Sequence, residues 1–419
     1  MEKANLSSMI NVIFIINCYH YNYKSIEPKV WVDIMLHTSL HVDTSLSYIA
    51  NTKLGIIMIR RDFLKTSVLG MSAISLASSE LFAGQKSRKF KVVCDFDIKY
   101  DEKEFEAKLW NPLPFDASYQ KVRYFKFDGN YDNYNINTNN KYDAKTLFTS
   151  WKKSDKKKLL HIEMEIETKY REVSLEFIKK ASSENLPIPE DVKLFLEPSA
   201  HIPTNGKIRE ITKKITKNLD DRFDKVQAIY DWVTETTFRD PKVIGCGIGD
   251  AGKMVESGYF GGKCTDISSL FVAILRAAGI PSREVFGIRL GKSDFSKALG
   301  KSDAKGFANI STWQHCRAEY FIPGAGWIPS DPADITKLEL VENLDYNDEK
   351  VKELRRRYVH SWEMNWVGFN MGRDFILSPK PTQFPLNMLG YPYGEIDDEV
   401  LNYYNPKAFA YNFTSQEIK

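Results

Sequence analysis

The residues with the clearest chemical potential begin with a cysteine that follows a glycine turn. Residues 261–266 read Gly-Gly-Lys-Cys-Thr-Asp and place Cys264 directly before an amphipathic run. His315 and Asp331 follow about 50 and 70 positions later. A thiol nucleophile needs a base that takes its proton and a third group that orients the base. The order Cys, His, Asp therefore predicts nucleophilic catalysis by Cys264.

Cys264 is expected in the first turn of a helix. Apolar residues recur after it at helical spacing, and the Gly-Ile-Pro sequence at 279–281 ends the pattern. The unpaired N–H groups and positive dipole of a helix start favour a thiolate and can face an oxyanion. We interpret Asp266 as a helix-start residue rather than a catalyst. Candidates for a second oxyanion donor are Tyr259 and the loop at 246–250.

Two strands of a hairpin are expected to carry the histidine and the aspartate. Residues 313–331 have strand-like composition on both sides of a Pro-Gly-Ala-Gly turn. Neighbouring strands can bring His315 within hydrogen-bond reach of Asp331, as a base and its orienter require. Asp334 stays open as the alternative orienter, and Asp331, which precedes a proline, also fits a turn start.

The neighbours of His315 on its strand have two interpretations each. Arg317 and Glu319 share the face of His315, where they either line a cleft or, as we favour, only pair with each other. Cys316 lies on the opposite face, because side chains alternate along a strand, and is expected in the core. A disulfide between Cys246 and Cys316 is the less favoured alternative in an oxidising compartment.

Taken together, these motifs resemble the transglutaminase-like superfamily, which is related in mechanism to papain-type cysteine proteases. The resemblance covers roughly residues 208–335 and is carried by Gly262-Lys263-Cys264-Thr265-Asp266, residues 275–283 (Leu-Arg-Ala-Ala-Gly-Ile-Pro-Ser-Arg), His315-Cys316-Arg317-Ala318-Glu319, and residues 326–332 (Gly-Trp-Ile-Pro-Ser-Asp-Pro). It implies that Cys264 is the nucleophile, His315 the general base and acid, and Asp331 the orienter. It also implies an α+β core in which the cysteine helix packs on an antiparallel sheet.

The resemblance implies a thiol acyl-transfer enzyme that acts on peptide or glutamine carboxamides through a thioester. Hydrolysis, as by a peptidase or amidase, is favoured over cross-linking because no calcium motif is evident. The alternative is an inactive transglutaminase-like module that binds protein or cell-wall peptides. No motif implies a cofactor or a metal ion. The 58 basic and 55 acidic residues give a net charge of only +3, so nucleic acid is not expected as a partner. The protein or peptide substrate is what the resemblance implies.

An export signal is predicted upstream of the core. Arg60 and Arg61, followed by Phe-Leu-Lys at 63–65 and a weakly apolar stretch of small residues, resemble a twin-arginine signal peptide. The mature protein is therefore expected in the bacterial periplasm or outside the cell, with no stable membrane span after signal removal.

The chain divides into five expected segments. Alternating runs such as 91–98 and 159–167 predict an antiparallel β-sandwich, and helices are expected near 208–219, 223–233 and 347–357. The aromatic-rich tail, with Trp362 and Trp366, is expected to close a core rather than wall a groove. The segments are a non-native or disordered extension (1–57), the signal peptide (58–83), an N-terminal β-sandwich (84–184), a linker (185–205) and a catalytic domain with a C-terminal extension (206–419).

Overall fold

The computed structural model of this protein describes residues 86–100 and 104–419. The predicted extension at 1–57 and the predicted signal peptide at 58–83 lie outside these residues. The described residues all belong to one compact unit. Within the described ranges, no helix is both long enough and apolar enough to cross a membrane.

A four-stranded antiparallel sheet forms the centre of the predicted catalytic region. Its order is β13 (Gly326–Ser330), β12 (Gln314–Ile322), β10 (Ser282–Arg289) and β15 (Trp366–Asn370). Every residue of β12 is buried, which indicates that both faces of this strand are covered. The hairpin expected from the sequence is confirmed, because β12 and β13 pair from Ala318 opposite Ser330 to Ile322 opposite Gly326.

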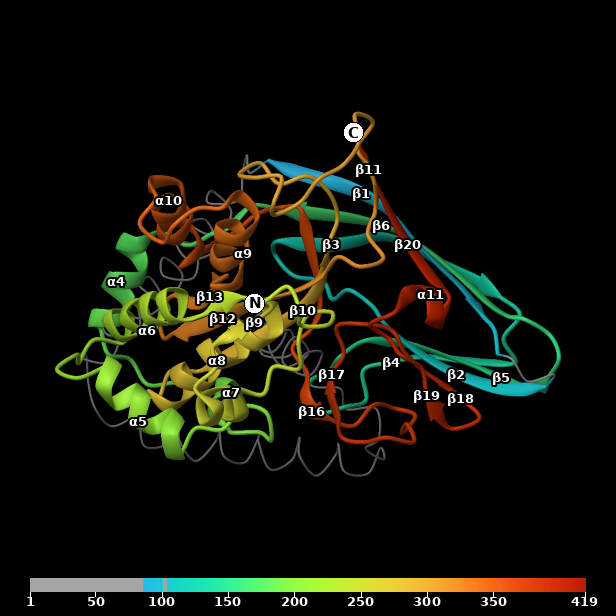
Figure 1. Cartoon of the computed structure of the whole chain (residues 1–419), viewed down its shortest axis with the longest axis horizontal. Coiled ribbons are helices and arrows are strands. Elements are labelled where there is room, and N and C mark those ends of the chain that lie inside the picture. Colours follow the sequence, from blue (N-terminus) through green and yellow to red (C-terminus); the bar gives the residue numbers. More distant parts are fainter. Residues whose placement is uncertain (1–85, 101–103) are drawn as a thin grey trace, which may run out of the picture. The chain divides into compact units, whose positions relative to one another are not determined.

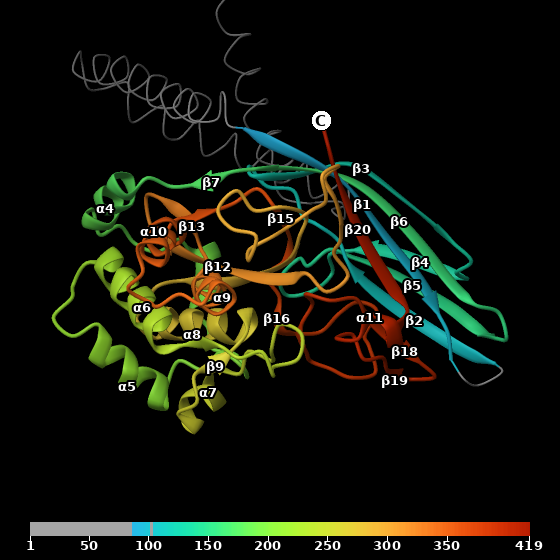
Figure 2. The same cartoon turned by 45° about the horizontal axis from the view of Figure 1, so that its top comes forward.

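Helix α8 (Cys264–Ala277) packs on this sheet against β10 and β12 and is covered by other helices (Figures 1 and 2). The predicted cysteine helix is thereby confirmed, and Gly279 follows it with a φ of 79° that favours glycine. The helices that contact α8 are α5 (Gly206–Ile215), α6 (Arg222–Thr236), α7 (Ala251–Ser257) and α9 (Ala333–Glu342). The sequence predicted α5 and α6, but not α7 or α9.

Two five-stranded antiparallel sheets form the second part of the unit. The first has the order β11 (Phe307–Asn309), β20 (Tyr411–Ile418), β1 (Ser87–Ile98), β6 (Lys158–Lys169) and β3 (Gln120–Gly129). The second has the order β19 (Glu399–Val400), β18 (Tyr393–Ile396), β2 (Phe105–Pro112), β5 (Thr146–Ser154) and β4 (Asn133–Asn137). Buried residues alternate with less buried ones along β6, as the sequence pattern predicts for a strand with one covered face.

The C-terminal strands complete both large sheets. β20 pairs with β1 from Lys89 opposite Ile418 to Phe96 opposite Tyr411, and β18 pairs with β2. In Figures 1 and 2 the red β20 lies beside the blue β1. The rings of Phe96 and Phe413 pack edge to face at 5.6 Å. The sheets are therefore not built from residues 84–184 alone, and the aromatic tail does close a core.

The remaining elements connect these layers. They are the pairs β7 (Arg171–Glu172) with β14 (Ser361–Trp362), β16 (Arg373–Phe375) with β17 (Leu386–Met388), and the parallel β8 (Phe238–Arg239) with β9 (Gly261–Gly262), and the helices α4 (Leu175–Ser183), η1 (Glu190–Leu196), α10 (Glu349–Tyr358) and α11 (Pro406–Phe409). Helix α10 confirms the charged helix expected at 347–357. The stretch predicted as a linker contains η1, whose Phe195 ring packs at 5.1 Å from Trp327 on the hairpin.

Candidate active site

Cys264 is the first residue of α8 and is 2% exposed. Asp266 fixes this helix start, because its carboxylate accepts N–H groups from Lys263 at 2.9 Å and Gly249 at 2.8 Å. The interpretation of Asp266 as a helix-start residue is confirmed. Gly247, with a φ of 87°, has no room for a side chain, since a Cβ there would lie 1.8 Å from Asp266. The glycine loop and the cysteine are therefore held together by one carboxylate.

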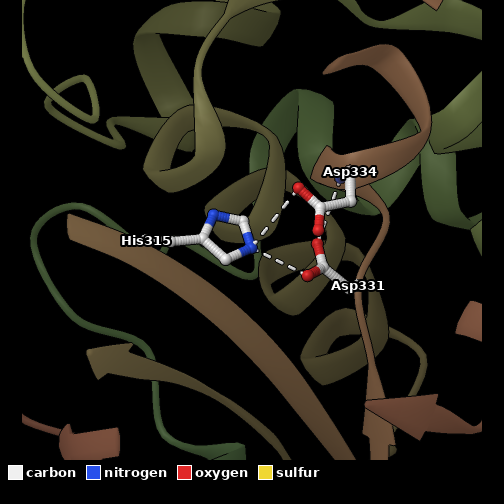
Figure 3. A group of neighbouring side chains, drawn as sticks. All are labelled: His315, Asp331 and Asp334. Carbon is white, nitrogen blue, oxygen red and sulfur yellow. Dashed lines mark hydrogen bonds and ion pairs between the residues drawn. The ribbon is translucent and has the colours of Figure 1, made fainter. Parts of the chain in front are cut away.

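His315 and Asp331 meet at the edge of the four-stranded sheet (Figure 3). Nε2 of His315 lies 2.8 Å from Oδ2 of Asp331, which directly follows β13. Oδ1 of Asp331 accepts the backbone N–H of Asp334 at 3.1 Å, so the aspartate also caps α9. Asp334 Oδ1 is 3.6 Å from the same Nε2, beyond hydrogen-bond distance. The geometry thus favours Asp331 over Asp334 as the partner of the imidazole.

Two buried arginines neutralise these carboxylates. Arg289 on β10 donates to Asp334, and Nε of Arg317 on β12 lies 3.3 Å from Asp331. Arg317 therefore lies at the site rather than pairing with Glu319 on its own strand. The charge of Arg289 outweighs burial and lowers the pKa of Asp334, whereas burial and then the charge of Asp334 raise the pKa of Asp331 in spite of His315 and Arg317.

Glu319 has a structural role away from the histidine. Its carboxylate binds Arg171 and, at 2.6 Å, Arg283. Glu319 is thus a structural residue, but the predicted pair between Arg317 and Glu319 is wrong, because Glu319 binds Arg171 and Arg283 instead.

The imidazole of His315 has an increased tendency to be protonated. Burial and the charge of Arg289 lower the pKa of His315, but Asp331 and Asp334 outweigh them and leave the pKa above its usual value. Since Nε2 faces Asp331, Nδ1 is the nitrogen left for the thiol of Cys264. One ring nitrogen of His315 therefore contacts Asp331, and the other is available to the thiol.

Cys264 has the strongest tendency to ionise among three adjacent thiols. Hydrogen bonds from Cys246 and then Cys316 lower the pKa of Cys264 well below its usual value, with a further contribution from His315 and against the effect of burial. The hydrogen bond with Cys264 and burial raise the pKa of Cys246, and burial and then Cys264 raise the pKa of Cys316. We infer one thiolate flanked by two protonated thiols.

The two flanking cysteines are free thiols. The Cys246 thiol donates to the Gln314 carbonyl oxygen at 3.1 Å and accepts from the Tyr391 hydroxyl at 3.0 Å. Cys316 is 2% exposed and packs in the core beside α8, as expected, with its thiol 3.6 Å from Thr265 Oγ1. The sequence did not predict that both cysteines lie close to Cys264. The only signal in the sequence was that three cysteines fall within the predicted catalytic domain.

Two tryptophans hold the backbone that carries the site. The indole N–H of Trp366 donates to the His315 carbonyl oxygen at 2.9 Å, and that of Trp362 donates to the Ser330 carbonyl oxygen at 2.9 Å. The side chains are only 3% and 2% exposed. They therefore position β12 and β13 from within the core, and the alternative that they wall a groove is wrong.

A cavity of about 340 Å³ opens onto Cys264 and His315. Cys246 lines it, so the glycine loop remains a candidate source of the second oxyanion donor. Tyr259 is 53% exposed, and its hydroxyl donates to Asp240, which removes it from this role. A larger cavity, of about 810 Å³, lies along the β1, β6 and β20 strands and contains neither Cys264 nor His315.

The His315, Asp331 and Asp334 group also has the composition of a metal site. Its ligand atoms lie within 4.8 Å of one another. However, Arg289 and Arg317 already form ion pairs with the carboxylates, and a divalent cation would lie beside two fixed positive charges. These residues are better suited to orienting an imidazole than to binding a cation.

The lowered pKa of Cys264 predicts reactivity at low pH. The rate of Cys264 alkylation by iodoacetamide should rise with a midpoint well below 9.0, because the thiolate is the reacting form. Peptide mapping by mass spectrometry at each pH measures this rate separately for each cysteine. Cys246 and Cys316, whose pKa values are raised, should react only at higher pH. A Cys264 midpoint at or above 9.0 would contradict the lowered pKa of this thiol.

The comparison with protein families agrees with this geometry. The model of the transglutaminase-like superfamily matches residues 209–332, which include Cys264, His315 and Asp331. The chain belongs to the transglutaminase-like superfamily.

The chain is also similar to a relative over most of its length. An uncharacterised protein of Haemophilus influenzae is 42% identical over 324 residues, which cover 75% of this chain and 87% of that protein. Among solved structures, a candidate cysteine protease from Cytophaga hutchinsonii has a TM-score of 0.46 and 15% identity, with 79% of this chain and 98% of that chain covered. The periplasmic domain of TgpA from Pseudomonas aeruginosa has a TM-score of 0.31 and 13% identity, with 65% and 94% covered.

Proposed function

We propose that this protein is an exported thiol acyl-transfer enzyme that hydrolyses peptide or glutamine carboxamides. The observation that carries the proposal is the 2.8 Å contact between Nε2 of His315 and Asp331, which leaves Nδ1 for a thiol with a lowered pKa. A base, its orienter and an activated nucleophile are the three groups that acyl transfer by cysteine requires. Membership of the transglutaminase-like superfamily supports the same reaction class.

In the first half of the reaction, the Cys264 thiolate attacks the carbonyl carbon and forms a C–S bond. The developing oxyanion lies near the start of α8, where the first N–H groups have no acceptor within the helix. The imidazolium of His315 then donates its proton to the leaving amine, and the C–N bond breaks. The product is a thioester on Cys264, and Asp331 stabilises the charged imidazole during this step.

In the second half, His315 takes a proton from the acyl acceptor, which attacks the thioester carbonyl. The C–S bond breaks, and the thiolate of Cys264 is restored. Water as the acceptor gives a carboxylic acid, whereas an amine gives a new amide. We favour water, consistent with the absence of a calcium motif in the sequence. Export is part of this proposal and rests on the twin-arginine pattern at 58–65.

The proposal is tested by incubating the full chain with a library of glutamine-containing peptides, with and without an added alkylamine. We expect cleaved or deamidated peptides as the main products by mass spectrometry, and at most minor incorporation of the amine. Predominant amine incorporation would reassign the protein as a cross-linking enzyme. No turnover and no trapped thioester with any peptide would favour a module that only binds peptides.

A further inference from the structure

The cavity at Cys264 has an unusual charge. Six basic side chains line it, and the residues that form its wall include no aspartate or glutamate. The net charge of the whole chain is only +3, so this accumulation is local. The basic residues are Arg239, Lys263, Arg289, Lys297, Lys301 and Lys337. A cleft of one charge sign concentrates ligands of the opposite sign.

These cations converge from separate parts of the fold. Arg239 belongs to β8, Lys263 directly precedes α8, and Lys337 belongs to α9. Lys297 and Lys301 come from the loop between β10 and β11. Charges on the solvated face of a single helix would all come from one element. Here the five basic residues just named come from four separate segments and line one cavity.

Most of these charges form no close ion pair with another described residue. Arg289 donates to Asp334 behind the cavity. Within residues 86–100 and 104–419, the side chains of the other five form no ion pair within 4.0 Å, although Asp334 acts on the charge of Lys337 and Lys263 acts on the charge of Asp240 from farther away. Lys297 and Lys301 are exposed, as lysines often are, but Arg239, Lys263 and Lys337 are partly buried. Partly buried and unpaired cations are costly unless a ligand neutralises them.

The pKa of Lys337 reflects the cost of burying a positive charge. Burial, followed by the charge of Arg289, lowers the pKa of Lys337 to about 7. The charges of Asp334 and then Cys264 act in the opposite direction on the pKa of the same ammonium group, so Lys337 is within electrostatic range of the thiol. A carboxylate bound in this cavity would stabilise the charged form of Lys337 beside the reacting carbonyl.

We infer that the substrate is an anionic peptide that carries a carboxylate close to the carbonyl attacked by Cys264. The inference rests on the proposed function and specifies its substrate class. A peptide supplies the acyl carbon and the carboxylate in one molecule. The same cations repel the ammonium group of a lysine acceptor but not water, which gives a physical reason for hydrolysis over cross-linking.

A pair of alkylating reagents tests the charge of the cavity without a known substrate. Iodoacetate and iodoacetamide both form a C–S bond with a thiolate and release iodide, but only iodoacetate is anionic. For Cys264 of the full-chain protein, we expect the ratio of the two rate constants to exceed that for mercaptoethanol by about tenfold or more, equivalent to ~1.4 kcal/mol of attraction. The excess should fall as salt is added.

Variants in which basic residues are replaced by glutamine identify the residues that attract the anionic reagent. Arg239→Gln combined with Lys337→Gln should lower the ratio several-fold while iodoacetamide still reacts. Because Lys337 is partly buried, the exposed pair Lys297→Gln with Lys301→Gln provides a second variant with less risk to folding, and it should lower the ratio in the same direction. Lys292→Gln is the matched control, since this exposed lysine lies outside the cavity, and its ratio should equal that of the wild type.

The outcomes separate this inference from the proposed function. A wild-type ratio equal to that of mercaptoethanol, with normal iodoacetamide reaction at low pH, would overturn the anionic substrate and leave the nucleophile intact. Failure of both reagents at Cys264 would overturn both. Protection by a glutamate-rich peptide but not by equimolar phosphate supports a carboxylate ligand. Equal protection by inorganic phosphate would overturn the assignment to carboxylates.

Discussion

Replacement of Cys264 by alanine is expected to abolish labelling by a thiol-directed acyl probe and to lower kcat/KM on the order of 10⁴-fold or more. The physical reason is that Cys264 alone combines a helix start with a pKa well below that of an ordinary thiol. Removal of the sulfur leaves only binding and oxyanion stabilisation. Mass spectrometry of the intact protein measures the labelling, and steady-state kinetics on a peptide found by the library assay measures the loss.

The neighbouring thiols supply matched controls. Cys246→Ala and Cys316→Ala each remove a hydrogen-bond donor that lowers the pKa of Cys264, so the thiolate should form at higher pH, but the probe should still label Cys264. Thermal unfolding should confirm that all three variants fold. Labelling of Cys264→Ala equal to that of the wild type would reject Cys264 as the nucleophile. Loss of labelling in Cys246→Ala alone would instead assign the nucleophile to the glycine loop.

Replacement of Asp331 by asparagine should lower kcat by about 10²- to 10⁴-fold with little effect on KM. We predict a positioning role for Asp331, because its carboxylate contacts Nε2 of His315 at 2.8 Å. Its carboxylate also raises the pKa of His315. The asparagine variant should therefore lose the imidazolium at lower pH, and the basic limb of the kcat profile should move in that direction. A purely structural residue would not cause this shift.

Asp334→Asn is the control for Asp331→Asn, since both aspartates are buried and approach the same nitrogen. Asp334 is 3.6 Å from Nε2 and pairs with Arg289. Its replacement should mainly destabilise the fold, by ~3–5 kcal/mol, because an arginine would remain buried without its partner. Denaturant unfolding measures that loss. If Asp334→Asn folds normally but is inactive while Asp331→Asn retains activity, the two roles are exchanged.

The sequence predicted the local elements of the site well. Cys264 begins a helix because an apolar stripe follows a glycine turn, and residues 313–331 form a hairpin because strand residues flank a Pro/Gly turn. Asp266 was recognisable as a helix-start residue for the same reason. Periodicity, caps and turns depend on neighbours within about one or two helical turns, so they can be read from the chain directly.

Contacts between segments that are distant in the sequence could not be predicted from it. The strands that complete the large sheets come from the C-terminal tail, and strand order depends on which edges meet in the folded chain. The same holds for the tryptophans that support β12 and β13 and for the arginines that bind Asp331 and Asp334. Residue types along the chain do not specify such partners, because many pairings satisfy the same local pattern.

The sequence by itself determined the chemistry that this protein offers: a thiol at a helix start, a histidine and an aspartate on a hairpin, and membership of the transglutaminase-like superfamily. Only the tertiary structure decided which aspartate lies 2.8 Å from His315, which thiols lie beside Cys264, and that basic residues from several segments line the cavity at Cys264. The reason is physical. Hydrogen-bond distance, burial and local charge belong to atoms brought together by folding, and the separation of those atoms is not encoded by spacing along the chain.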